Sequence, residues 1–161
     1  MDDKRLLIAW HSRTGTAETL ALAAARGAGN RALCIEVSDV MPHDLMSCAG
    51  YLFACPENLG TMSGAMKEMF DTCYYPVLGR IEGRPYATII AAGSDGEGAQ
   101  RQIDRIATGW RLKRVAEPWI VMMDAQTPEA ILAPKIVAKD DIDAAFALGQ
   151  SLAEGLAIGV F

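Results

Sequence analysis

The chain has 161 residues, of which 51% are hydrophobic and 22% charged, and its formal net charge is −5. This length and composition predict one globular domain over residues 1–161, with a single solid core. The negative charge and the lack of any lysine or arginine cluster argue against a nucleic-acid partner, and no apolar run is long enough to span a membrane.

The first predicted strand, residues 5–10, runs into a small loop that is rich in hydroxyl groups, and an alanine-rich helical pattern follows. The loop hydroxyls, the free N–H groups of the first helical turn and the positive end of the helix dipole converge there. Such a group of donors binds a phosphate monoester well. An ordinary strand–helix turn capped by serine or threonine is the alternative. The predicted phosphate-binding residues are Ser12, Arg13, Thr14, Gly15, Thr16 and Ala17.

The second predicted strand, residues 32–37, precedes a segment with a weak helical pattern, residues 38–49. The third predicted strand, residues 50–55, leads into a loop and then into a helix that begins after Ser63. The methionine and aromatic residues of this helix recur at helical spacing, so we expect them in the core.

The fourth predicted strand, residues 86–92, precedes a segment with three glycines in six residues, 93–98. Such glycines indicate unusual backbone angles or a close approach to another group, and a plain Asp-Gly turn is the alternative. A helix follows Gly98, and the fifth predicted strand covers residues 117–122. An irregular segment with two prolines, residues 124–139, leads to the closing helix.

The alternation of apolar strands with helices predicts an α/β fold, a doubly wound sandwich with helices on both faces of a sheet. We expect five parallel strands in the order 2-1-3-4-5. In that order a ligand binds beyond the carboxyl ends of strands one and three, where the strand order reverses. The loops that follow Trp10, Cys55 and Ala92 should therefore meet at the binding site.

The first loop resembles the phosphate-binding loop of the flavodoxin-like FMN-binding family. Ser12, Thr14, Gly15 and Thr16 match the small and hydroxyl positions of that family, whereas Ala17 replaces a threonine that many flavodoxins carry. The resemblance covers most of the chain and implies a flavodoxin-like fold with one noncovalent FMN.

The second loop resembles the P-E-x-x-x-x-x-x-G loop of NAD(P)H-dependent FMN reductases. Lys67 and Asp71 match the K-x-x-x-D helix of those enzymes, although their spacing also allows a simple surface pair. The resemblance implies that this loop and the third contact the flavin. The residues concerned are Pro56, Glu57, Asn58, Leu59, Gly60, Thr61 and Met62, followed by Gly93, Ser94, Asp95 and Gly96. Glu57 is expected either to accept a hydrogen bond from a ribityl hydroxyl or to be a solvated loop acid.

The resemblance further implies that NAD(P)H reduces the flavin by hydride transfer to N5, after which a small acceptor such as a quinone or free flavin is reduced. The flavin carries this chemistry, so no catalytic side chain and no metal ligand are predicted. Two alternatives remain: a flavodoxin-type electron carrier that docks on partner proteins, and a flavodoxin-like domain without cofactor. The lack of Trp or Tyr in residues 56–64 and 93–98 favours the reductase, and Ala17 is the one hint toward a domain without cofactor.

The N-terminal residues and the cysteines indicate a cytoplasmic protein. No signal peptide is visible, and the four cysteines lack metal-binding or redox spacing, so we expect reduced thiols, with Cys34 and Cys55 inert in the core. His11, beside the first loop, is interpreted as structural. Tyr74 and Tyr75 follow the helix of the third strand, and we expect them to form part of a homodimer interface. The alternative is that both tyrosines pack on their own domain.

Overall fold

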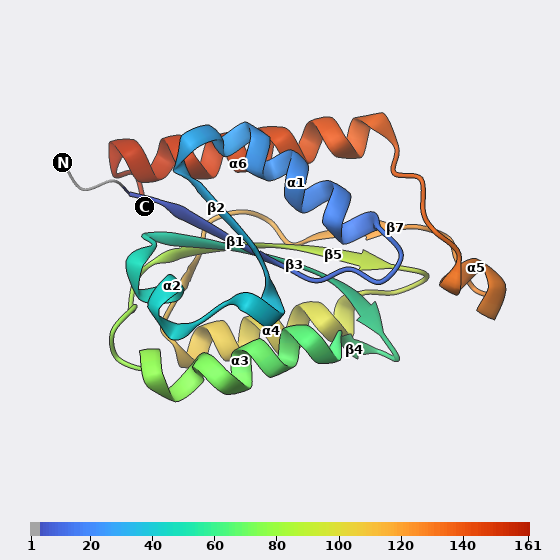
Figure 1. Cartoon of the computed structure of the whole chain (residues 1–161), viewed down its shortest axis with the longest axis horizontal. Coiled ribbons are helices and arrows are strands. Elements are labelled where there is room, and N and C mark those ends of the chain that lie inside the picture. Colours follow the sequence, from blue (N-terminus) through green and yellow to red (C-terminus); the bar gives the residue numbers. More distant parts are fainter. Residues whose placement is uncertain (1–3) are drawn as a thin grey trace.

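The computed structural model describes residues 4–161 as a parallel sheet between two layers of helices (Figure 1). The sheet has the order β2-β1-β3-β5-β6, which confirms the predicted flavodoxin-like order. The outermost place is shared by β6 and β7, because both pair in parallel with β5. The parallel strands are β1 (Leu6–Trp10), β2 (Ala32–Glu36), β3 (Gly50–Asn58), β5 (Pro85–Ala92), β6 (Lys113–Arg114) and β7 (Trp119–Met122), and β4 (Thr61–Met62) is antiparallel to β3.

The helices lie on both faces of this sheet. One face is covered by α1 (Thr16–Ala28) and α6 (Lys139–Ile158), and the other by α3 (Gly64–Val77) and α4 (Glu97–Gly109) (Figure 1). The alanine-rich α1 packs very closely on α6. A Cβ at Gly149 would lie 1.9 Å from the carbonyl oxygen of Ala24, so the crossing requires glycine there. The shorter helices are η1 (Gly29–Arg31), η2 (Val37–Asp39), α2 (Pro42–Ser47) and α5 (Pro128–Leu132).

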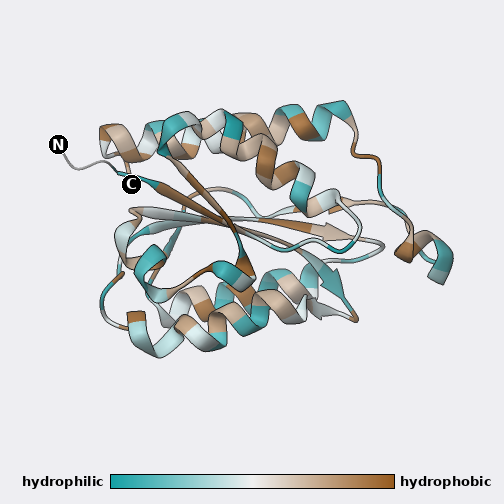
Figure 2. Cartoon of the chain, viewed as in Figure 1, coloured by the Kyte–Doolittle hydropathy of each residue, from teal (hydrophilic) through white to brown (hydrophobic). Residues whose placement is uncertain are grey.

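The strand β1 shows why the apolar runs are continuous. Its side chains alternate between the two faces, so Leu6 and Ile8 join the core under α1 and α6, while Leu7 and Ala9 join the core under α3 and α4. The central strands are accordingly coloured mainly as hydrophobic in Figure 2. Met66, Met69, Phe70 and Cys73 of α3 are buried, as predicted for core residues.

Several stretches differ from the sequence predictions. The fifth strand begins at Trp119 rather than at residue 117, and the short strand β6 precedes it. The third strand does not end at residue 55 but continues to Asn58 and forms a hairpin with β4. Leu59 and Gly60 both have positive φ, 53° and 76°, which is the geometry of a two-residue hairpin turn. The weak pattern after β2 contains η2 and α2, and the irregular segment before α6 contains α5. In the part that the structure describes, no helix has the length and apolarity needed to cross a membrane.

The two tyrosines at the end of α3 have different surroundings. The ring of Tyr74 stacks on Trp110, with 5.6 Å between the ring centroids, so this tyrosine packs on its own domain. Tyr75 is 79% exposed. The ring of Tyr75 meets that of Tyr74 edge-on and is otherwise exposed, so Tyr75 is the tyrosine available to the predicted interface between subunits.

Candidate functional site

The predicted phosphate loop lies at the carboxyl end of β1 and leads directly into α1. Gly15 has a φ of 107° and precedes the helix, and its N–H donates to Ser12 Oγ over 3.0 Å. Thr19 Oγ1 donates to the carbonyl oxygen of Gly15 over 2.8 Å, which holds the loop against the first turn of the helix. The positive φ explains why glycine stands at this position.

Thr16, the first residue of α1, carries a buried hydroxyl group without a partner. The residue is 3% exposed, and within the described residues its Oγ1 is the one buried side-chain oxygen or nitrogen that lacks a hydrogen bond. Such a group normally destabilises a protein unless something binds it. The N–H groups of the first helical turn likewise have no acceptor within the helix. The loop therefore contains polar groups that its own structure does not satisfy.

The second loop is a hairpin that is fastened to the start of α4. The Glu57 carboxylate accepts hydrogen bonds from the N–H groups of Gly96, over 2.8 Å, and Ala99, over 3.2 Å. Glu57 is thus not simply a solvated loop acid, because it caps a helix whose N-terminus favours an anion. Each of its oxygens accepts one of these bonds and keeps a further lone pair. A Cβ at Gly98 would lie 2.0 Å from the carbonyl oxygen of Gly60, so the hairpin and α4 are in direct backbone contact.

The remaining hairpin residues divide into an anchored base and an open tip. Met62 is buried, and its N–H donates to Gln102 Oε1 over 2.8 Å. Leu59, at the tip, is fully exposed, and Thr61 is exposed as well. Pro56 lies within β3. The half-buried Asn58 pairs with Thr61 across the hairpin.

The third loop is supported from behind by the segment that follows β7. A Cβ at Gly93 would lie 2.4 Å from the carbonyl oxygen of Ala125, and Ala125 N–H donates to the carbonyl oxygen of Gly93 over 3.1 Å. Gly96 has a φ of 93°, so both explanations offered for these glycines, unusual angles and close approach, are confirmed. Ser94 and Asp95 lie exposed between them.

A lysine that no sequence pattern indicated lies beside the predicted phosphate loop. The N–H of Lys135 donates to the carbonyl oxygen of Thr14 over 2.8 Å, and its Nζ lies 3.4 Å from Thr14 Oγ1. Lys135 belongs to the irregular segment between β7 and α6, where no periodic pattern or motif distinguishes it from a surface lysine. Arg13, which was predicted to bind the cofactor, is exposed.

The first and second loops are joined by His11 and the buried Ser63. Nδ1 of His11 and Oγ of Ser63 lie 2.9 Å apart in a hydrogen bond. Burial lowers the pKa of His11, and it outweighs the opposite effect of Glu36. Burial also raises the pKa of Cys55 to about 12, although hydrogen bonds with Ser63 act against that rise. The His11–Ser63 hydrogen bond thus links the first loop to the start of α3, and Cys55 is confirmed as a core residue.

At the carboxyl edge of the sheet, four segments are thus hydrogen-bonded each to the next, and the last is hydrogen-bonded to the first. His11 joins the first loop to the second, Glu57 joins the second to the third, and Gly93 joins the third to the segment after β7. The N–H of Lys135 joins that segment to the first loop. The structure therefore brings together all three predicted loops and adds a fourth segment to them.

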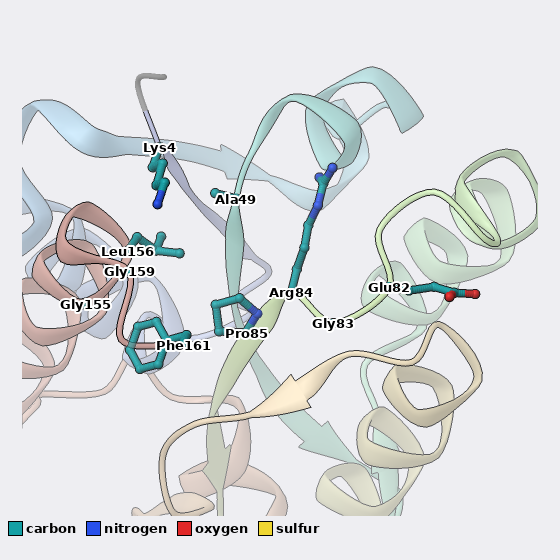
Figure 3. Close-up of a pocket in the computed structure, with 10 residues that line it drawn as sticks. All are labelled: Lys4, Ala49, Glu82, Gly83, Arg84, Pro85, Gly155, Leu156, Gly159 and Phe161. Atoms are coloured by element: carbon teal, nitrogen blue, oxygen red, sulfur yellow. The ribbon is translucent and has the colours of Figure 1, made fainter. Parts of the chain in front are cut away.

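A separate hollow of about 270 Å³ lies at the opposite edge of the sheet, near the start of β5 (Figure 3). The Arg84 side chain extends away from it and donates to the carbonyl oxygens of Leu45, Met46 and Cys48. In an open parallel sheet ligands bind at the carboxyl ends of the strands, and this hollow lies at the amino ends. Arg84 has a structural role there, so we do not assign this hollow as the functional site.

Comparison with known proteins identifies the fold. Neither a protein-family model nor a curated protein sequence matches this chain. Among solved structures, a flavodoxin from the domain Archaea is similar with 16% identity and a TM-score of 0.77, over 95% of this chain and 99% of that one. A flavodoxin, WrbA-like protein from Agrobacterium tumefaciens is similar with 14% identity and a TM-score of 0.73, over 96% of this chain and 98% of that one.

Longer proteins contain the same fold. The flavodiiron protein from Giardia intestinalis is similar with 17% identity and a TM-score of 0.76 over 96% of this chain. This chain spans only 36% of that protein. Identities this low establish the flavodoxin-like fold and nothing finer.

Proposed function

We propose that this protein binds FMN at the carboxyl edge of its sheet and acts as an oxidoreductase. The observation that carries the proposal is the buried hydroxyl of Thr16, which lacks a partner at the N-terminus of α1. A phosphate oxygen is an acceptor for that hydroxyl, and its charge is favoured by the helix dipole. Native proteins leave few buried polar groups unsatisfied, so this free hydroxyl supports a bound acceptor.

The residues present fit the phosphate end of FMN. Thr14, Thr16 and the N–H groups of the first turn of α1 are the donors, and Gly15 allows the loop to turn without a Cβ. Ala17 contributes only its N–H, because its side chain is a buried methyl group. Without the threonine that many flavodoxins have at this position, the loop still offers these donors to a phosphate.

The second and third loops would position the ring end of the cofactor. Glu57 and Gln102 hold the hairpin on α4, so backbone groups of residues 57–62 and 93–96 have a fixed relative placement. Backbone donors held in this way can adjust the electronic properties of a flavin without any acid or base side chain. The bound flavin supplies the redox chemistry.

We further propose that the protein is an NAD(P)H-dependent reductase of a small acceptor such as a quinone or flavin. Neither the hairpin nor the third loop carries an aromatic side chain, and the exposed hairpin tip is Leu59. A flavin bound there would keep one face open to a nicotinamide and then to the acceptor. Oxidation of NADH or NADPH by the FMN-loaded protein, with a panel of quinones and flavins, tests this part of the proposal. Rapid one-electron exchange without nucleotide oxidation would instead support a carrier.

The substitution Thr16→Val tests the placement of the phosphate. Valine has nearly the same shape, so the protein should stay folded, and removal of an unsatisfied buried hydroxyl should leave its stability equal or higher. Loss of a hydrogen bond to a charged group should weaken FMN binding by about tenfold or more. FMN titration followed by flavin fluorescence measures this. Thr72→Val, at an exposed position of α3, is the matched control and should bind FMN like the wild type. Equal FMN affinity in Thr16→Val and Thr72→Val would reject this placement.

A further inference from the structure

The ammonium group of Lys135 is held in place by neutral oxygens alone. Its Nζ donates to the carbonyl oxygens of Ala133, over 2.6 Å, and Ile131, over 2.9 Å, and lies 3.4 Å from Thr14 Oγ1. Within residues 4–161, Lys135 takes part in none of the ion pairs. A half-buried positive charge is thus fixed in position with no negative partner among the described residues.

The backbone places this charge at the phosphate loop. The N–H of Lys135 donates to the carbonyl oxygen of Thr14, so the segment after β7 is attached to the loop at the residue whose hydroxyl lies near Nζ. A phosphate oxygen bound by Thr14 Oγ1 would lie within about 6 Å of Nζ, given ordinary hydrogen-bond lengths. At that separation an ammonium group attracts a phosphate dianion appreciably even where water is present.

We propose that Lys135 is a phosphate-binding residue that selects phosphorylated ligands over their dephosphorylated forms. Lys135 is far from the loop in the sequence, and the path of the segment between β7 and α6 places it beside the loop. The proposal rests on the proposed function in that FMN is the expected ligand, and the chemical class that it names is a phosphate monoester. Thr14, Thr16 and the first turn of α1 supply neutral donors, and Lys135 supplies the charge.

A purely structural role for Lys135 makes a different prediction. If the lysine serves only to hold the last carbonyl groups of α5, its loss should disturb the loop and weaken FMN and riboflavin binding alike. If it binds phosphate, its loss should weaken FMN binding and leave riboflavin binding unchanged. The comparison of FMN with riboflavin therefore separates the two roles without any measurement of enzyme activity.

The test uses Lys135→Met, Lys135→Arg and, as a matched control, Lys139→Met, which removes an exposed lysine of α6. We expect Lys135→Met to weaken FMN binding about tenfold at low salt, while riboflavin binding changes less than twofold. Lys135→Arg should retain most of the FMN affinity, and Lys139→Met should bind both flavins like the wild type. High salt should reduce the difference between the wild type and Lys135→Met, because ions screen a half-exposed charge.

Unchanged FMN binding in Lys135→Met, or an equal loss of FMN and riboflavin binding, would overturn the proposal. If the wild-type protein binds no FMN, the proposed function fails, and inorganic phosphate then decides the role of Lys135. Thermal stabilisation by phosphate, relative to chloride at equal ionic strength, should then be present in the wild type and absent from Lys135→Met. Equal stabilisation of both proteins by phosphate, or of neither, would reject the lysine as a phosphate ligand.

Discussion

Replacement of Glu57 by glutamine should loosen the hairpin from α4. The carboxylate accepts two backbone hydrogen bonds, from Gly96 and Ala99, at the N-terminus of a 13-residue helix. The amide of glutamine keeps one oxygen acceptor, but its NH₂ group meets one of the two N–H donors. The variant therefore loses one charge-assisted hydrogen bond, worth about 1.5–3 kcal/mol, and the attraction between the charge and the helix dipole, about 0.3–1 kcal/mol.

Because Glu57 is half-buried, we expect a loss near the lower end of that range, about 2 kcal/mol. For a protein of this size the loss corresponds to a fall in Tm of about 4–8 °C. Glu97→Gln is the matched control, since it removes the same charge from the first turn of the same helix at an exposed position. It should cost about 0.3–0.5 kcal/mol, which is the dipole contribution alone.

Urea unfolding followed by circular dichroism gives both free energies, and hydrogen exchange locates the effect. The amides of Gly96 and Ala99 should exchange faster in Glu57→Gln, whereas amides in the middle of β3 should follow only the global loss of stability. If Glu57→Gln and Glu97→Gln are equally stable, within about 0.3 kcal/mol, the hydrogen bonds of Glu57 do not support the hairpin and the reasoning is refuted.

Burial lowers the pKa of His11 in the folded state, so the unfolded chain takes up the proton first and the free energy of unfolding should fall as the pH drops below 6.5. His11→Asn should show a weaker fall between pH 7 and pH 5. An identical slope in the variant would count against this assignment. Burial raises the pKa of Cys55 to about 12 and that of Cys73 to about 11. A thiol reagent at pH 8 should therefore label both cysteines slowly in the native protein and quickly after denaturation. Rapid labelling of either cysteine in the native protein would contradict its burial. Equilibrium titration should show tighter binding of FMN than of FAD, because the sequence lacks a second nucleotide-binding motif, and equal affinities would oppose the proposal. Light scattering should show a dimer that Tyr75→Ser weakens, whereas a mass near 17.3 kDa for the wild type would reject the dimer.

Local patterns in the sequence determined the architecture. Continuous apolar runs predicted buried parallel strands, and helical spacing predicted α3, α4 and α6, because each of these signals depends on residues that are close together in the chain. The strand order placed three loops at one edge, and the glycines in those loops indicated where the backbone turns or approaches a neighbour. The prediction of a phosphate-binding loop used the same local reasoning, since a loop and the helix after it are contiguous.

The tertiary structure decided how that edge is held together. Glu57 accepts from Gly96, 39 residues along the chain, and His11 pairs with Ser63, 52 residues along it. The contact of Lys135 with Thr14 spans 121 residues, so no local pattern could assign any of these three contacts. The sequence did not indicate that Glu57 caps α4, which follows because the hairpin that carries it folds onto that helix. Lys135 lies in a segment without periodicity, and only the path of the backbone from β7 to α6 brings its charge to Thr14. Sequence periodicity reports which face of an element is buried, whereas the partner of a single polar side chain depends on where distant segments meet in the folded chain.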